Sequence, residues 1–454
     1  MDVESLGLGV FVCAGLVLLV LPAVPAGAVL FAIVALRALT DFGMTSTGTG
    51  PAAFVAASAG LGVLAMIAAV VPSGTPLRPA VHAVVGAILF VLALGSWVAI
   101  DIAGFSTTTV SEAAAYVSML ALFVLAARFG RGRGNDPLRH LALAVLPAGV
   151  LSIAGFVSGQ EFALSPGGRL AGTFSHPSPA GAFFAVAALT LIVVAWQLRS
   201  PWALVSAAVS LVGLVMTQTL GAVLAFAVGG LVFLLFSAVL RTIQKAAVLI
   251  VTALLGTFAF LSSSAAGRLA EFEEMDVAAA LATGSSANSL EWRIINWERL
   301  LHLWSERPVL GYGLGSTSTY VMPLGGPPHS LPIELLVEFG LVGAAVILAA
   351  AVPILMFIAR WTARGRWEGA LMLALVAFML VNGAESNLPD YTAAMYLLAV
   401  VFGLLYARLR TTPEADPPGG SAAAVPAVPD LPAVPRWDGR RRTATGAHSG
   451  RVSP

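Results

Sequence analysis

Long apolar runs, separated by short polar breaks, constrain the fold of this chain more than any other feature of its sequence. Each run approaches the ~20 residues that a helix needs to cross the ~30 Å hydrocarbon layer of a bilayer. Lipid offers the backbone no hydrogen-bond partners, so such runs are stable there only as helices. We predict an all-α fold, a polytopic membrane helical bundle of about 12–13 spans. The candidate spans are 6–21, 23–38, 52–71, 80–100, 110–127, 139–157, 179–198, 202–217, 219–240, 246–264, 331–358, 368–384 and 391–408.

The composition excludes several other classes of protein. Charged residues make up 10% of the chain and hydrophobic residues 58%, whereas soluble domains carry about 25% charged residues. A net charge of +1 gives no electrostatic basis for a nucleic-acid partner. The single cysteine, Cys13, excludes disulfides within the chain and Cys-based metal sites.

Arginines indicate which side of the membrane each break faces, because short cytoplasmic loops carry an excess of Arg and Lys. From residue 128 onward, basic clusters recur at alternate breaks, and we place these breaks in the cytoplasm. The segments that then face outward are 158–178, 217–219, 265–330 and 385–390. The first two runs, split by Pro22 and Pro25, form either two short helices or one broken helix. One broken helix puts the N-terminus inside and favours 12 spans.

This topology divides the chain into four regions. They are an N-terminal transmembrane bundle (1–264), one large extracytoplasmic loop with amphipathic helices (265–330), C-terminal transmembrane helices (331–410) and a disordered cytoplasmic tail (411–454). The tail is rich in Pro, Ala, Gly and Ser and cannot bury enough apolar surface to fold. A weak contact with anionic lipid is the alternative for it.

Two helices are predicted in the large loop. The first, 268–281, begins with several acidic residues. The second begins at Asn288, which forms a capping-box pattern with Glu291. Its apolar stripe, which suits a helix at the membrane interface, consists of Leu290, Ile294, Trp297, Leu301 and Trp304. Arg293 on this helix can bind two oxygens of a diphosphate at once, or it anchors the helix to lipid phosphate.

The end of the loop carries a second group of candidates. Residues 307–315 contain alternating glycines but follow a helix, so we interpret them as a turn and not as a dinucleotide loop. His329 is either a general base near neutral pH or a structural residue beside a proline-rich turn. Glu334 and Glu338 are spaced i, i+4 and share one face of the next helix, where ionised carboxylates need a cavity.

The remaining outward segments add polar residues on the same predicted face. Arg169 lies in the segment that leads to His176, and Gln218 lies in the hairpin 216–221. His176 and His329 occur on separate loops without metal-ligand spacing, so we expect no metal site and no cofactor. The gathering of these residues on one face predicts a functional site there.

Several motifs occur together in a characteristic order. They are Arg169-x-x-Gly172-Thr173-Phe174, Trp292-Arg293 with Trp297, Arg307-Pro308-x-x-Gly311-x-Gly313, and His329-Ser330 followed by Glu338-x-Gly340-Leu341-x-Gly343. From about residue 130 to 405, the chain resembles the bacterial O-antigen ligase and O-antigen polymerase family of integral-membrane glycosyltransferases.

The resemblance implies a C-type glycosyltransferase-like bundle in the bacterial cytoplasmic membrane. Members transfer a glycan from an undecaprenyl-diphosphate carrier to an acceptor hydroxyl on the outer side, without a metal or nucleotide sugar. The expected partners are therefore a lipid-linked oligosaccharide, a glycan or lipid-glycan acceptor, and membrane lipids. His329 matches the histidine that activates the acceptor, Arg293 the loop arginine that holds the diphosphate, and Arg169 the arginine of the earlier outer loop.

One position departs from the family pattern. Leu220 stands where members commonly have an arginine, after Thr217-Gln218-Thr219. Either Arg169 or Arg299 compensates for the missing guanidinium, or the chain has lost or altered activity. A transporter or flippase of lipid-linked or small polar cargo, and a non-catalytic assembly protein, are the alternative functions. A transporter would have ionisable residues near mid-span, whereas here they gather at helix ends.

Overall fold

The computed structural model describes residues 26–41, 78–130, 136–165, 167–238, 245, 276–283, 286 and 288–411. The predicted spans 6–21, 52–71 and 246–264, the start of the predicted helix 268–281 and the tail 412–454 lie outside the described residues.

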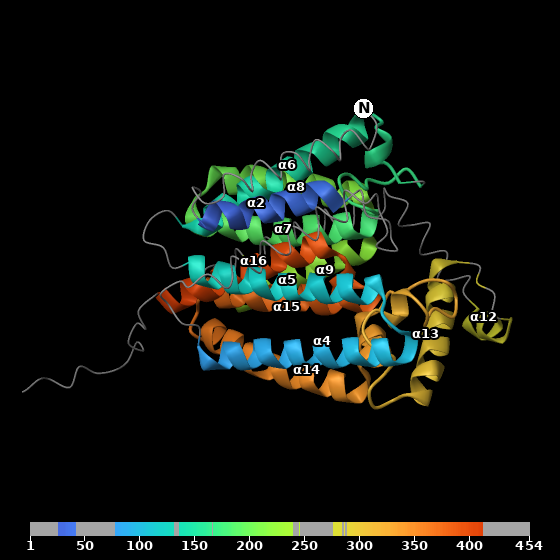
Figure 1. Ribbon diagram of the computed structural model, residues 1–454. Helices are drawn as coiled ribbons and strands as arrows, with labels where there is room; N and C mark the ends of the chain where they lie inside the picture. Colours follow the sequence, from blue (N-terminus) through green and yellow to red (C-terminus); the bar gives the residue numbers. More distant parts are fainter. Residues whose placement is uncertain are drawn as a thin grey trace, which may run out of the picture. The chain divides into compact units, whose positions relative to one another are not determined.

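The described part of the chain is helical, with one isolated antiparallel bridge between Leu164 and Leu170. Its α-helices (Figure 1) are α2 (Ala26–Thr40), α4 (Pro79–Ala103), α5 (Thr107–Phe129), α6 (Pro137–Val157), α7 (Pro177–Leu198), α8 (Pro201–Thr217), α9 (Leu220–Phe236), α12 (Val277–Thr283), α13 (Ser289–Glu306), α14 (Leu331–Ala363), α15 (Trp367–Glu385) and α16 (Thr392–Thr411). Short 3-10 turns are η3 (Glu161–Ala163), η4 (Ser316–Ser318) and η5 (Leu388–Asp390).

Within these residues, seven helices are long and apolar enough to cross a membrane, and three apolar helices are shorter. The seven are α4, α5, α6, α7, α14, α15 and α16, and the shorter ones are Leu30–Thr40, α8 and α9. Every predicted span within the described ranges coincides with a helix. The fold class, a polytopic helical membrane protein, is therefore confirmed.

Local sequence signals explain where several helices begin. Pro137, Pro177 and Pro201 occupy the first helical turn, where the missing N–H would have had no intrahelical partner. The side chains of Asp136 and Ser200 accept hydrogen bonds from the first turns of α6 and α8. These caps satisfy donors that a membrane interior would leave unpaired.

Helix α7 lies at the centre of the bundle. In its most apolar stretch 83% of the residues are buried, compared with 11% in α14. Phe174, Phe183 and Phe184 form an aromatic cluster at its start, with ring centroids 5.0–5.8 Å apart. Many apolar side chains of α14 are instead exposed, as at Leu348, which is 68% exposed. A helix with an apolar, exposed surface fits a lipid-facing position.

The four segments predicted to face outward meet at one end of the bundle, on the right in Figure 1. The N–H of Leu170 donates to the Met216 carbonyl at 3.1 Å, and Arg293 Nη1 donates to the Glu385 carbonyl at 3.1 Å. We call this the loop end of the bundle. Asp41, just after α2, accepts a backbone hydrogen bond from Ser175, so α2 also ends there.

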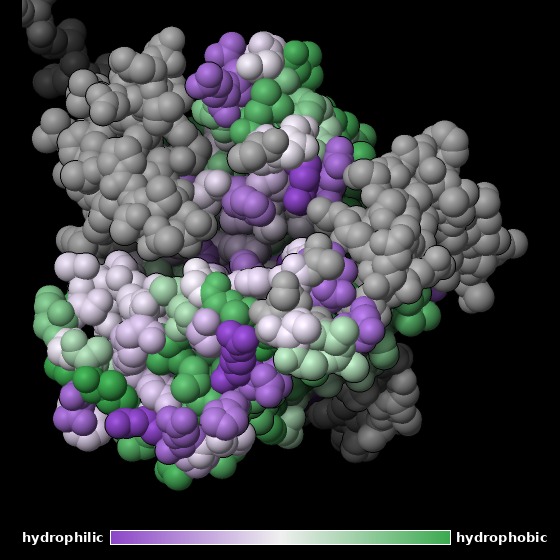
Figure 2. Space-filling view, turned by 90° about the vertical axis from the view of Figure 1, so that its right-hand side faces the viewer, coloured by the Kyte–Doolittle hydropathy of each residue, from purple (hydrophilic) through white to green (hydrophobic). Residues whose placement is uncertain are grey.

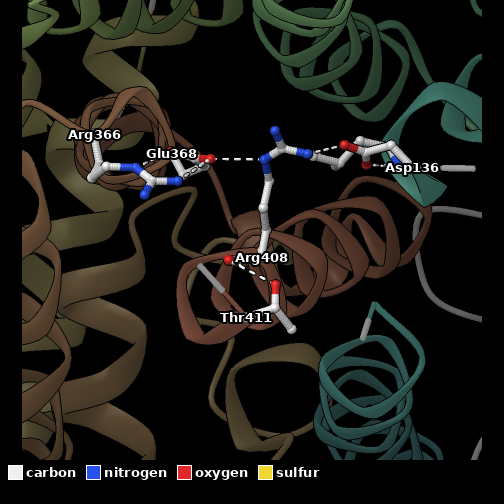
Figure 3. Close-up of polar contacts among 6 residues, drawn as sticks. Asp136, Arg366, Glu368, Arg408 and Thr411 are labelled. Atoms are coloured by element: carbon white, nitrogen blue, oxygen red, sulfur yellow. Dashed lines mark hydrogen bonds and ion pairs between the residues drawn. The ribbon is translucent and has the colours of Figure 1, made fainter. Parts of the chain in front are cut away.

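An ionic network ties helices together at the opposite end (Figure 3). Arg408 of α16 contacts Asp136 before α6 and donates through Nε to Glu368 of α15 at 2.7 Å. Arg366 pairs with the same carboxylate of Glu368, which is fully buried. The guanidinium of Arg408 also lies 5.2 Å from the Trp367 ring centroid. Removing one partner from such a network would leave a buried charge uncompensated.

Helix α14 is broken at Gly340, whose φ of 60° and ψ of −167° are not helical. Residues 308–313, within the predicted turn 307–315, lie against this break and satisfy its backbone groups. A freed N–H or C=O inside a membrane protein requires such a partner. The pairs are Leu341 N–H with Pro308 O (2.9 Å), Val342 N–H with Val309 O (3.1 Å), Tyr312 N–H with Val337 O (2.8 Å) and Gly313 N–H with Glu338 O (2.8 Å).

We expect Gly340→Ala to destabilise the protein strongly. The φ/ψ region of Gly340 is open almost only to glycine and costs other residues about 1–3 kcal/mol, and a Cβ there would collide with the Val309 carbonyl. Thermal unfolding in detergent measures the effect. The matched control is Gly86→Ala in α4, where a Cβ meets no atom within 4 Å. Equal melting temperatures for the two variants would contradict this account of the break.

Candidate active site at the loop end of the bundle

Helix α13 forms one wall of the candidate site. Asn288 caps it as predicted, because its Oδ1 accepts from the backbone N–H groups of Leu290 and Glu291 at 3.0 and 2.9 Å. The face that α13 buries carries Asn296 and Leu300, whereas Leu301 of the predicted apolar stripe is 39% exposed. The helix therefore packs on the protein through a face that includes a polar residue. Its location at the membrane interface remains a prediction.

The buried face of α13 holds the segment that precedes His329. Asn296 Nδ2 donates to the carbonyls of Gly326 and Pro327 at 3.4 and 3.2 Å. Trp297 Nε1 donates to the carbonyl of Pro328 at 2.6 Å. Three successive carbonyls are thus bound by adjacent side chains of one helix.

His329 adopts a left-handed backbone conformation with φ of 50°, which is uncommon for a residue with a Cβ and costs about 1–2 kcal/mol. Its ring lies 5.8 Å from the Trp292 ring, centroid to centroid. Burial, followed by the positive charges of Arg293 and His176, lowers the pKa of His329 to about 4. The imidazole is therefore neutral at pH 7 and able to accept a proton.

Arg293 lies on α13 one turn before Trp297. The hydrogen bond to the Glu385 carbonyl uses one of the five N–H donors of its guanidinium. Its charge acts on His329, so the two predicted site residues are electrostatic neighbours.

Arg169 reaches the hairpin between α8 and α9. Its Nε donates to the carbonyl of Thr217 at 2.9 Å, and its Nη2 donates to Thr219 Oγ1 at 3.0 Å. The guanidinium therefore lies beside Leu220, the position where the family commonly has an arginine. Gln218 ends α8 in a left-handed conformation with φ of 49° and is exposed.

His176 connects these two halves of the site. Its Nδ1 accepts from the backbone N–H of Ser178 at 3.3 Å, capping α7. Burial and the charge of Arg169 lower the pKa of His176, and His176 in turn acts on His329. We call Arg169, His176, Arg293 and His329 the electropositive group, because its two guanidiniums carry positive charge beside the two imidazoles. Figure 2 shows this end of the bundle, where hydrophilic side chains gather toward the middle of the face.

Glu385 adds a carboxylate at the same place. It lies against Gly221 in the first turn of α9, where a Cβ would overlap its Oε1. The N-terminal turn of a helix favours negative charge, and Arg293 binds the main chain of the same residue. Glycine at position 221 is therefore required for this approach.

Glu334 and Glu338, which we predicted to share one helix face toward a cavity, are 4% and 1% exposed. Glu338 Oε1 accepts from the N–H and Oγ1 of Thr317 at 3.2 and 2.7 Å. Among the described residues, Oε2 of neither glutamate has a hydrogen-bond partner. Glu112 of α5 lies close to this pair, against Gly315.

Arg299 is the other predicted arginine of α13. It lies six residues beyond Arg293, about 9 Å along the helix axis, and its side chain is half-buried. Among the residues that the structure describes, no three His, Cys, Asp or Glu side chains are placed to hold a metal ion.

A family model for O-antigen ligase matches residues 205–348. We call this matched region the O-antigen ligase domain, and the match supports the O-antigen ligase family. The resemblance predicted from the sequence motifs is thereby confirmed, and the family implies glycan transfer of the O-antigen ligase or polymerase kind. No curated protein matches the chain.

The O-antigen ligase domain contains only part of the electropositive group. Arg293 and His329 lie within the match, whereas Arg169, His176 and Glu385 lie outside it. The site is therefore assembled by the bundle as a whole. Sequence reasoning identified the two arginines and His329, but it assigned no role to His176 or to the amide of Asn296. For His176, the only signal in the sequence was the motif that leads from Arg169 to this histidine.

We expect His329 to stay neutral until the pH falls to about 4. Histidine NMR of labelled protein measures its titration, with the signal assigned by its absence in His329→Gln. A positive neighbour opposes protonation, so Arg293→Gln should move the midpoint upward. An unchanged midpoint would mean that the charge of Arg293 does not reach the imidazole.

Proposed function

We propose that this protein transfers a glycan from an undecaprenyl-diphosphate-linked donor to an acceptor hydroxyl at the outer face of the bacterial cytoplasmic membrane. The observation that carries the proposal is that Arg293 acts electrostatically on His329, while Arg169 acts on His176, which in turn acts on His329. Arg169 and Arg293 both lie at the loop end of the bundle, on different segments of the chain.

The chemical step uses His329 as the base. Its neutral imidazole takes the proton of the acceptor hydroxyl while the hydroxyl oxygen forms a bond to the anomeric carbon of the donor sugar. The bond between that carbon and the phosphate oxygen breaks, and the lipid diphosphate leaves with the electron pair. The proton remains on the imidazole until the acceptor product departs.

Arg293 and Arg169 would bind the diphosphate. A preorganised cation lowers the barrier when negative charge grows on the leaving group, and a guanidinium can bind two phosphate oxygens. The same cations keep His329 neutral in the free enzyme. A bound diphosphate would offset their charge and raise the pKa of His329 toward its ordinary value, so the base becomes stronger when the donor is present.

The arginines at the opposite end support the outward orientation of the site. Arg366 and Arg408, with Arg128 nearby on α5, lie at the end away from the site, and an excess of arginine marks the cytoplasmic side. The donor sugar chain and the acceptor would then both approach from outside the cell. In the candidate spanning helices that the structure describes, charged side chains lie toward helix ends and not at mid-span. This distribution fits a transferase better than a transporter.

Loss of the base should abolish transfer. We expect His329→Ala to lower the rate from a lipid-linked oligosaccharide by about 10²–10⁴-fold, the usual contribution of a general base. The assay follows the glycosylated acceptor with purified protein in detergent or vesicles. Wild-type rates in His329→Ala would remove His329 from the mechanism, and movement of donor across vesicles without bond formation would support a flippase instead.

Arg293→Lys tests the geometry of diphosphate binding. Lysine keeps the charge but loses the planar pair of donors, so we expect a drop of about 10²-fold. Retained activity in this variant would favour the role of Arg293 as an anchor to lipid phosphate.

A separate experiment tests whether Arg169 compensates for the arginine that the family commonly has at the position of Leu220. We expect Arg169→Gln to reduce transfer by about 10²-fold, because it removes the guanidinium beside the hairpin. Adding Leu220→Arg to Arg169→Gln should recover at least part of this loss, since it returns a guanidinium to the hairpin. Arg299→Gln is the comparison. A larger loss in Arg299→Gln than in Arg169→Gln would assign the compensation to Arg299.

A further inference from the structure

The backbone carbonyls of Gly326, Pro327 and Pro328 accept hydrogen bonds from side chains of another element, α13. Pro327 and Pro328 have no N–H, so these two residues offer no backbone donor to fix their position. The segment Gly326–Pro328 offers carbonyl oxygens, and Asn296 and Trp297 bind all three of them. Asn296 is fully buried, which makes its amide a permanent part of this arrangement.

The ring of Trp292 lies close to Gly326, where this segment begins, and to His329, which follows it. A Cβ at Gly326 would lie 3.1 Å from the Trp292 ring, and the same ring lies against the imidazole of His329. The left-handed conformation of His329 persists only where the surroundings impose it. The contacts from α13 are the described interactions that fix the residues immediately before it.

We propose that Asn296 and Trp297 are positioning residues that hold His329 at a fixed place relative to Arg293. Arg293, Asn296 and Trp297 are spaced by three and four residues on α13, so they share one face of a rigid helix. The base and the diphosphate-binding arginine are thereby fixed by a single element. This inference rests on the proposed function, and it assigns to α13 a role beyond carrying Arg293.

The test is Trp297→Phe, which keeps an aromatic ring and removes the Nε1–H donor. We expect kcat to fall at least tenfold with little change in KM for the donor, because Arg293 is untouched. The pKa of His329 should also rise, since the released segment exposes the imidazole. The acid limb of the kcat/KM profile reports this shift, and a purely structural defect would not move it.

The matched control is Trp304→Phe on the same helix. Trp304 Nε1 has no hydrogen-bond partner among the described residues, so its loss should leave kcat and the pH profile unchanged. Asn296→Asp is the second variant. It is isosteric, but a carboxylate cannot donate to the carbonyls of Gly326 and Pro327, and it should reproduce the effects of Trp297→Phe.

A readout independent of transfer separates this inference from the proposed function. Diethyl pyrocarbonate modifies neutral imidazoles, and mass spectrometry measures its reaction at His329 in the folded protein. We expect at least threefold faster modification in Trp297→Phe and Asn296→Asp than in wild type and Trp304→Phe. Faster modification without any transfer activity in wild type would retain the positioning role and reject the proposed function. Equal modification and equal pH profiles in all folded variants would overturn the positioning role.

Discussion

The requirement that buried backbone groups find partners governs how this protein places polar residues beside its spanning helices. Helix α14 breaks at Gly340, and residues 308–313 supply donors and acceptors for the freed groups on both sides of the break. The part of α14 before Gly340 therefore need not continue the helix of the part after it. His329 immediately precedes this first part, and Glu334 and Glu338 lie within it.

A second consequence concerns charge. Arg169, His176, Arg293 and His329 lie at the loop end of the bundle. Glu112 of α5 and Glu334 and Glu338 of α14 act on one another. Among the described residues, Oε2 of both Glu334 and Glu338 has no hydrogen-bond partner. The opposite end of the bundle is fixed by ion pairs around Glu368 and Arg408 (Figure 3).

The structure also suits the presence of Leu220 at a position where the family commonly has an arginine. Arg169 binds Thr217 and Thr219 on either side of the hairpin tip, so a guanidinium already lies where the family pattern supplies one from the hairpin itself. Glu385 lies against Gly221 in the first turn of α9, and Arg293 binds its main chain. The compensation by Arg169 that we propose rests on these contacts around Leu220.

The sequence by itself indicated the helical membrane class, the spans that fall within the described residues, the cap at Asn288 and the resemblance to the O-antigen ligase family. Apolar run length, capping patterns and local motifs are properties of neighbouring residues. The sequence also identified Arg169, Arg293 and His329 as candidates. Only the tertiary structure decided that Arg169 binds the hairpin 217–219, that Arg293 acts on His329, and that residues 308–313 pair with the backbone at the break in α14. Those outcomes depend on contacts between segments tens to hundreds of residues apart, and such contacts leave no periodic or local signal in a single chain.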